Sequence, residues 1–199
     1  YGFPIELTEE LAKEKGIVID REEFNRKMAE HQKLSQTSSA GMFKGGLANH
    51  NEKTVRLHTA HHLLLAGLQA IVGPEIKQRG SNITEERLRI DFLCDHKLTD
   101  EEKKGVEDWV NDKISQGLDV VRKEMPLAEA EKIGAEMEFG AKYPEIVSVY
   151  KIEYKNGNAI SKEFCGGPHI SNTNELGHFK IQKEEAVAQG IRRIKAILE

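Results

Sequence analysis

The sequence is poor in cysteine, in long apolar runs and in net charge, and each shortage excludes a class of protein. Its 199 residues contain only 2 Cys, so a disulfide scaffold is excluded and a reducing compartment is indicated. The longest apolar stretch, around residues 63–68, is far too short to span a bilayer, so no membrane partner is expected. The formal net charge of −4 disfavours a general nucleic-acid binder, and no DNA partner is expected, although a local basic patch is compatible with it.

The sequence also lacks a signal peptide, an initiator Met and a phosphate-binding loop. The N-terminus has no signal-peptide pattern, which favours a cytoplasmic location. The first residue is not Met, so we expect the chain to be a piece of a longer protein. Gly45 and Gly46 are not followed by the Lys-Ser/Thr of a phosphate-binding loop, so no ATP site is expected in this chain.

Residues 1–36 are expected to be helical. Thr8 is predicted to cap one helix that ends at Gly16, and Asp20 is predicted to begin a second helix, with Glu23 completing a capping box. This second helix is expected to fade near Leu34. Small and polar residues then dominate residues 37–52, which we interpret as a linker between two domains.

Residues 53–199 are expected to form the main domain. Apolar spacing predicts a helix over residues 54–72, a helix capped by Thr99, and a short helix within residues 125–139. Alternation predicts a strand over residues 87–92. A hairpin is predicted to join strands at 147–154 and 160–164 through Asn156-Gly157. Residues 179–198 suit either a strand or a helix. The mixture indicates an α+β fold, with an N-terminal helical segment followed by antiparallel strands packed with helices.

Four side chains form a candidate metal site. His58 and His62 are four residues apart on a predicted helix, so both imidazoles project from one face. Cys165 and His169 flank two glycines after a predicted strand, and two His, one Cys and a further His make a plausible zinc set. The alternatives are a surface histidine at 58 and a buried, apolar cysteine at 165. A zincin protease is disfavoured, because no Glu lies between the two histidines.

The order and spacing of several motifs resemble alanyl-tRNA synthetase over essentially the whole chain. The motifs are Tyr-Gly-Phe-Pro at 1–4, Phe-Lys-Gly-Gly-Leu-Ala at 43–48, His-Thr-Ala-His-His-Leu-Leu at 58–64, Gln78, Cys-Gly-Gly-Pro-His-Ile-Ser-Asn-Thr at 165–173 and Gly-Ile-Arg-Arg-Ile at 190–194. Threonyl-tRNA synthetase has a similar editing domain, but the first and last of these motifs favour the alanine enzyme.

This resemblance implies that residues 53–199 are a zinc-binding editing domain and that residues 1–36 end the tRNA-recognition domain. Such a domain hydrolyses the ester at the mischarged 3′ end of tRNA-Ala carrying serine or glycine. The parent enzyme attaches alanine to tRNA-Ala with ATP and Mg²⁺, at a site outside this chain. Editing is needed because a pocket for alanine cannot firmly exclude glycine or serine. The oligomeric state stays open.

The resemblance also implies roles for individual residues. Zinc would be held by His58, His62, Cys165 and His169, and it would either acidify water or organise the pocket, since four protein ligands make a closed site. Gln78 would position water or substrate. Thr59 would recognise the serine side chain, although a hydroxyl bonded to a nearby helix carbonyl is the equal alternative.

Arg192 and Arg193 are predicted to contact tRNA phosphates, with a solvated sheet face as the alternative. Two residues depart from the family pattern: His61 and Pro168 each stand where threonine is usual. These departures keep a second function open, namely a non-catalytic, zinc-stabilised tRNA-binding module. A third is a freestanding trans-editing deacylase.

Overall fold

The computed structural model describes residues 5–40, 47–137 and 143–199, and the chain divides into two compact units, Tyr1–Gly41 and Met42–Glu199. The first unit contains helices α1 (Ile5–Glu14) and α2 (Arg21–Ala40). The predicted start of α2 is confirmed, since Asp20 Oδ1 accepts a hydrogen bond of 2.9 Å from the Glu23 N–H. The predicted cap at Thr8 is wrong, because α1 begins at Ile5 and Thr8 lies inside it. Helix α2 runs past Leu34, as no Gly or Pro interrupts it before Gly41.

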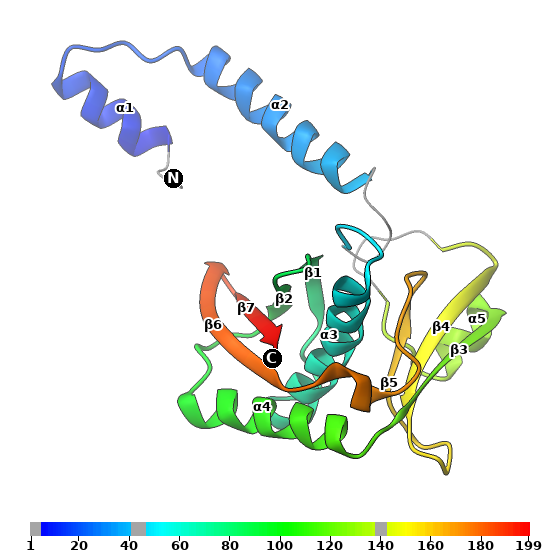
Figure 1. Cartoon of the computed structure of the whole chain (residues 1–199). Helices are drawn as coiled ribbons and strands as arrows, with labels where there is room; N and C mark the ends of the chain where they lie inside the picture. The colour runs from blue at the N-terminus through cyan, green and yellow to red at the C-terminus, as the bar shows by residue number, and fades with distance from the viewer. Residues whose placement is uncertain (1–4, 41–46, 138–142) are drawn as a thin grey trace. The chain divides into compact units, whose positions relative to one another are not determined.

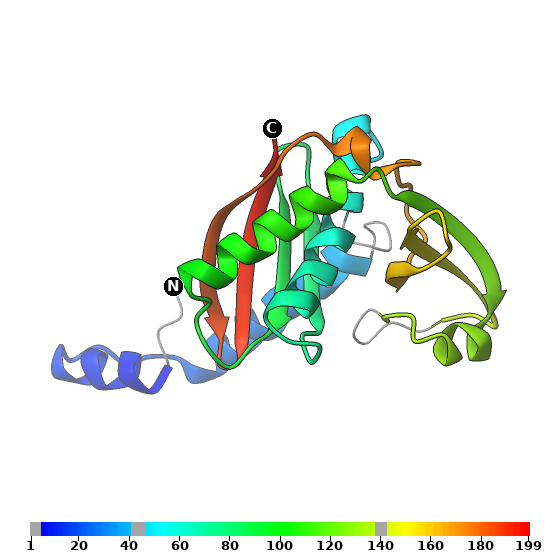
Figure 2. The same cartoon turned by 90° about the horizontal axis from the view of Figure 1, so that it is seen from below.

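The second unit is built on a four-stranded antiparallel sheet in the order β1-β2-β7-β6. Helices α3 (Glu52–Ile71) and α4 (Asp100–Ser115) cover one face of this sheet, as Figure 2 shows. Alternate residues of β2 pack with α3 leucines in the main core, which accounts for their complete burial. The strands of this sheet are β1 (Gln78–Ile83), β2 (Leu88–Leu93), β6 (Phe179–Ala188) and β7 (Ile191–Leu198).

A smaller antiparallel sheet has the order β3-β4-β5, with strands Asp119–Pro126, Ile146–Glu153 and Ala159–Phe164. The short helix α5 (Leu127–Lys132) packs on it around a second apolar cluster that includes Met125 and Phe164. Helix α3 contacts β1 and β2 of the large sheet and β5 of the small one, and therefore links the two (Figure 1). A 3₁₀ turn, η1 (Thr173–Leu176), leads into β6.

The predicted α+β class is confirmed, together with α3, β2, the Thr99-capped α4 and the β4–β5 hairpin. Residues 179–198 form the hairpin β6–β7, which turns at Gly190 with a φ of 69°. The sequence did not predict β1 or β3. Both are edge strands. The sequence of β1 is mostly polar and half of the residues of β3 are charged, as is common in strands whose outer edge faces solvent.

Part of the expected linker at 37–52 has defined structure. Residues 37–40 form the end of α2, and Leu47 is buried and bridges Ile83 of β1. Asn51 caps α3, because its side chain accepts a hydrogen bond from the Thr54 N–H. The motif at 1–4 and residues 43–46 lie outside the described residues. Among the helices described, none is long and apolar enough to cross a bilayer.

Candidate active site

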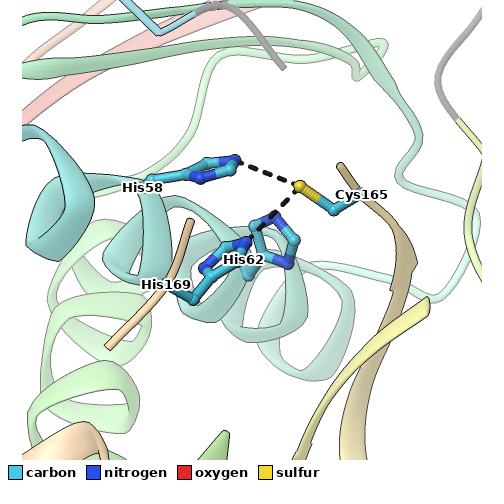
Figure 3. Close-up of side chains that lie close together, drawn as sticks. All are labelled: His58, His62, Cys165 and His169. Atoms are coloured by element: carbon cyan, nitrogen blue, oxygen red, sulfur yellow. Dashed lines mark hydrogen bonds between the residues drawn. The ribbon is translucent and has the colours of Figure 1, made fainter. Parts of the chain in front are cut away.

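The structure brings His58, His62, Cys165 and His169 together where the small sheet meets α3. One ligand-type atom from each residue lies within 4.8 Å of the other three. Cys165 Sγ is 3.4 Å from His58 Nε2 and 3.4 Å from His169 Nε2, as the dashed lines in Figure 3 show. Two histidines come from successive turns of α3, and the other two residues come from the loop that follows β5.

The spacing of these atoms suits a tetrahedral zinc ion. Zinc bonds of about 2.3 Å to sulfur and about 2.0 Å to nitrogen, at a tetrahedral angle, imply a sulfur–nitrogen separation of about 3.5 Å. The two separations of 3.4 Å are close to this value. A thiolate with imidazoles is also a donor set that zinc prefers. The four residues would therefore hold the ion that the resemblance implies.

The imidazole of His58 is oriented through its other nitrogen. His58 Nδ1 lies 3.1 Å from the Pro168 carbonyl oxygen, which can only accept, so Nδ1 carries the proton and Nε2 keeps its lone pair. Because the backbone carbonyl of Pro168 makes this contact, replacing the usual threonine with proline retains it.

His169 is oriented by Thr59. The Thr59 hydroxyl lies 3.0 Å from His169 Nδ1 and 3.3 Å from the Val55 carbonyl oxygen, and it accepts a bond of 3.3 Å from the Ile170 N–H. One donated and two accepted bonds use the full capacity of a hydroxyl. The side chain is completely buried and does not line the neighbouring cavity. Its geometry therefore suits holding His169 rather than meeting a substrate.

The side chain of Glu163, which was not predicted from the sequence, contacts the imidazole of His62. Glu163 Oε1 lies 3.3 Å from His62 Nδ1 and accepts a hydrogen bond of 3.0 Å from the Ser161 hydroxyl. Carboxylate–histidine–metal arrangements of this kind are typical of zinc sites. Burial raises the pKa of the Glu163 carboxyl to about 8. The available signal was two polar residues, Ser161 and Glu163, on one buried face of the strand that leads to Cys165.

Burial also keeps the histidines neutral. It lowers the pKa of His58 to about 4, and it lowers the pKa of His62 and of His169 well below the ordinary value, with neighbouring histidines adding to the effect. A neutral imidazole has the free lone pair that a metal needs. The charge state of the site is thus set for metal binding near neutral pH.

The loop after β5 approaches α3 so closely that it requires glycine. A Cβ atom on Gly167 would lie only 2.6 Å from His58 Cε1. The start of the loop is fixed by a hydrogen bond of 3.1 Å from the Cys165 N–H to the Ser148 carbonyl oxygen on β4. Gly167 therefore lets Pro168 reach His58.

A cavity of about 30 Å³ adjoins the four residues, and His58, His62 and Cys165 form part of its wall. This volume is sufficient for water. Gln78, at the start of β1, faces the same cavity, as the resemblance implied for a residue that positions water or substrate. The other residues around it are His61, Leu65, Ser81, Glu136, Met137, Glu163 and Phe164.

Arg192 and Arg193 lie on β7 and do not line this cavity. Arg193 forms a two-pronged ion pair with Asp91 of β2, at 2.6 and 2.8 Å. Arg192 pairs with the buried Glu184 on β6. Both guanidinium groups are thus paired with carboxylates of neighbouring strands. The contact of these arginines with tRNA phosphates stays a prediction.

Comparisons with known proteins agree with the motifs. Residues 147–195 match the family "Threonyl and Alanyl tRNA synthetase second additional domain". The whole chain is 51% identical over 199 residues to the alanine–tRNA ligase of Treponema denticola and 54% identical over 198 residues to that of Borreliella afzelii. It spans 32% of the length of each of these curated relatives. The alanine–tRNA ligase of Thermus thermophilus is 46% identical over 145 residues, which are 72% of this chain and 16% of that protein. The resemblance to alanyl-tRNA synthetase is therefore confirmed, for about a third of such an enzyme.

Proposed function

We propose that this chain is the editing part of an alanyl-tRNA synthetase and that it hydrolyses the ester of tRNA-Ala mischarged with serine or glycine. One observation carries the proposal: four side chains that could hold a metal ion come from two distant segments and meet beside a cavity that Gln78 also faces. On this proposal the partner is the mischarged 3′ end of tRNA-Ala. The cofactor is zinc, whereas ATP and Mg²⁺ would serve only the aminoacylation site of a parent enzyme.

The reaction is ester hydrolysis. Water adds to the aminoacyl carbonyl carbon, the ester C–O bond breaks, and the ribose hydroxyl leaves with a proton. Zinc, when bound, would supply Lewis-acid chemistry for this site. Gln78 would hold water or the ester through its amide, which can both donate and accept hydrogen bonds.

The remaining residues act by positioning. Thr59 and Pro168 hold His169 and His58 by their Nδ1 atoms, and Glu163 does the same for His62. Each contact fixes its ring, and those at His58 and His169 also leave Nε2 free for the metal, which preserves the shape of the site during the reaction. We therefore assign Thr59 to the support of His169 instead of to serine recognition.

The test is deacylation of Ser-tRNA-Ala and Gly-tRNA-Ala by the zinc-loaded chain, with Ala-tRNA-Ala as the control substrate. Cys165→Ala removes a ligand and is expected to lower the rate by at least about 100-fold. Cys94→Ala is the matched control, because Cys94 is a cysteine of the same chain that is distant from the four ligands in sequence and does not line the cavity. It should leave the rate within a few-fold of wild type.

The outcomes separate the alternatives. Selective hydrolysis that Cys165→Ala abolishes supports editing. Zinc and tRNA binding without hydrolysis at high chain concentration would favour the non-catalytic tRNA-binding module. Coding sequence upstream of residue 1 that encodes an aminoacylation domain would separate an editing domain in cis from a freestanding deacylase.

A further inference from the structure

His61, the histidine of the α3 motif that is not one of the four potential ligands, lies at the cavity and lacks a hydrogen-bond partner there among the described residues. His61 is 3% exposed and lines the cavity beside Gln78. Its Nε2 is a buried atom with no hydrogen-bond partner among the residues that the structure describes. A buried polar atom of this kind is costly unless something binds to it. His61 therefore supplies one polar contact that the folded chain itself does not use.

The surroundings of His61 narrow the identity of its ligand. A second metal ion is disfavoured, because it would need His62, which the proposed zinc site already uses, and only His61 and Glu163 would then remain as ligands. The cavity also carries the carboxyl group of Glu136, which is a better partner than an imidazole for the ammonium group of an amino acid. What remains for His61 Nε2 is a neutral polar partner, which is water when the cavity is empty of substrate and a polar group of the substrate when it is bound.

We propose that His61 Nε2 hydrogen-bonds the side-chain hydroxyl of a seryl ester, which makes His61 a residue that determines specificity for serine over alanine. This inference rests on the proposed function. A hydroxyl suits the position because it can donate or accept, and so it pairs with either tautomer of the ring. An alanyl ester has a methyl group there and would leave Nε2 buried without a partner.

The consequence is discrimination against the correct product of aminoacylation. Sites that hydrogen-bond a substrate hydroxyl reject the analogue that lacks it far more strongly than apolar pockets reject an extra methylene. For one contact to a neutral imidazole, we expect a contribution of roughly 10- to 100-fold to the ratio of kcat/KM for Ser-tRNA-Ala over Ala-tRNA-Ala. The contact thus helps to spare Ala-tRNA-Ala from hydrolysis.

The experiment measures this ratio in three forms of the zinc-loaded chain. His61→Phe keeps a ring but removes both nitrogens, and it should lower the ratio by roughly 10- to 100-fold. His61→Gln places an amide near the position of Nε2 and should retain most of the ratio. Zinc affinity, measured by competition with a chelator, should stay the same in all three. If the larger Phe disturbs zinc binding, His61→Leu supplies the apolar change in a smaller side chain.

Failure of this inference differs from failure of the proposed function. A wild-type chain that hydrolyses Ser-tRNA-Ala, with an unchanged ratio in His61→Phe or His61→Leu, would overturn the role of His61 alone. An equal loss with both substrates would also overturn it, because the residue would then act on a group that they share. A zinc-loaded wild-type chain that hydrolyses neither ester would overturn the proposed function, and this inference with it.

Discussion

Replacing Thr59 with valine should weaken zinc binding without changing the shape of the side chain. The hydroxyl is completely buried and contacts His169 Nδ1 at 3.0 Å, the Ile170 N–H at 3.3 Å and the Val55 carbonyl at 3.3 Å. Valine keeps the volume but leaves the His169 and Ile170 donors without an acceptor. The His169 ring then loses the contact that fixes its tautomer and orientation.

Two magnitudes follow from these contacts. Each donor that stays buried without an acceptor should cost about 1–3 kcal/mol, so the free energy of unfolding of the metal-free chain should fall by a few kcal/mol. Loss of a contact that orients a ligand typically costs about 10–100-fold in metal affinity. Thr59→Ser is the matched control because it keeps the hydroxyl, and it should retain nearly wild-type zinc affinity.

The assays are chelator competition for zinc and urea unfolding of the metal-free chain. Unchanged zinc affinity in Thr59→Val would refute the positioning role. So would a variant with normal zinc affinity that loses only hydrolysis of Ser-tRNA-Ala, since that result would return Thr59 to serine recognition.

Three more predictions concern close contact, pH and helix capping. Gly167→Ala should lower the free energy of unfolding by about 1–3 kcal/mol and weaken zinc binding, because its Cβ would lie 2.6 Å from a ring carbon of His58. Gly166→Ala is the control, since its Cβ would meet nothing within 4 Å. Equal effects of the two changes in chelator competition would contradict this prediction. On acidification from pH 6.5 to about 4 the metal-free chain should lose up to about 3 kcal/mol from His58 alone, because burial lowers the folded-state pKa of His58 to about 4 and the unfolded chain takes up the proton first. Burial lowers the pKa of His62 and His169 in the same direction, so the histidines together should raise stability up to pH 6.5. The raised pKa of Glu163, about 8, has the opposite sign and lowers stability as the pH rises from 4.5 to 8. Urea unfolding should therefore show a maximum near pH 6.5, and a steady rise from pH 4 to 8 would contradict this. Thr99→Ala should reduce stability by about 1 kcal/mol, because the Thr99 hydroxyl accepts the Glu102 N–H in a capping box, and an unchanged urea midpoint would argue against the cap.

The sequence predicted those parts of the fold whose local signals were strong. Helix α4 has a capping box, β2 alternates strictly between buried and partly exposed residues, and the β4–β5 hairpin has an Asn-Gly turn. Strands β1 and β3 were missed because an edge strand can be polar on both faces. Their formation depends on partners far along the chain, which no local pattern reveals.

In the candidate site, too, some residues could be predicted from the sequence and others could not. Spacing and resemblance selected the four potential ligands and Gln78. The structure places four of these five residues at one cavity, and the fifth, His169, lies against the other three ligands. The residues that hold these side chains were beyond prediction, because their roles arise from tertiary contacts. Glu163 meets His62 only after β5 packs on α3, and the hydrogen bonds of Thr59 reach across about 110 residues of sequence to His169.

The separation of the ligands along the chain makes the metal a cross-link. His58 and Cys165 are 107 residues apart, so an ion that joins them closes a loop that contains the small sheet and strands β1 and β2 of the large one. In the chain-entropy view, closing a loop of this length in the unfolded state removes freedom equivalent to about 4–5 kcal/mol. A chain that has been synthesised only as far as α4 carries two of the four ligands. The proposed hydrolase would therefore gain its metal site only when β5 and the loop after it have docked on α3, so no ester could be cleaved before this part of the domain has folded.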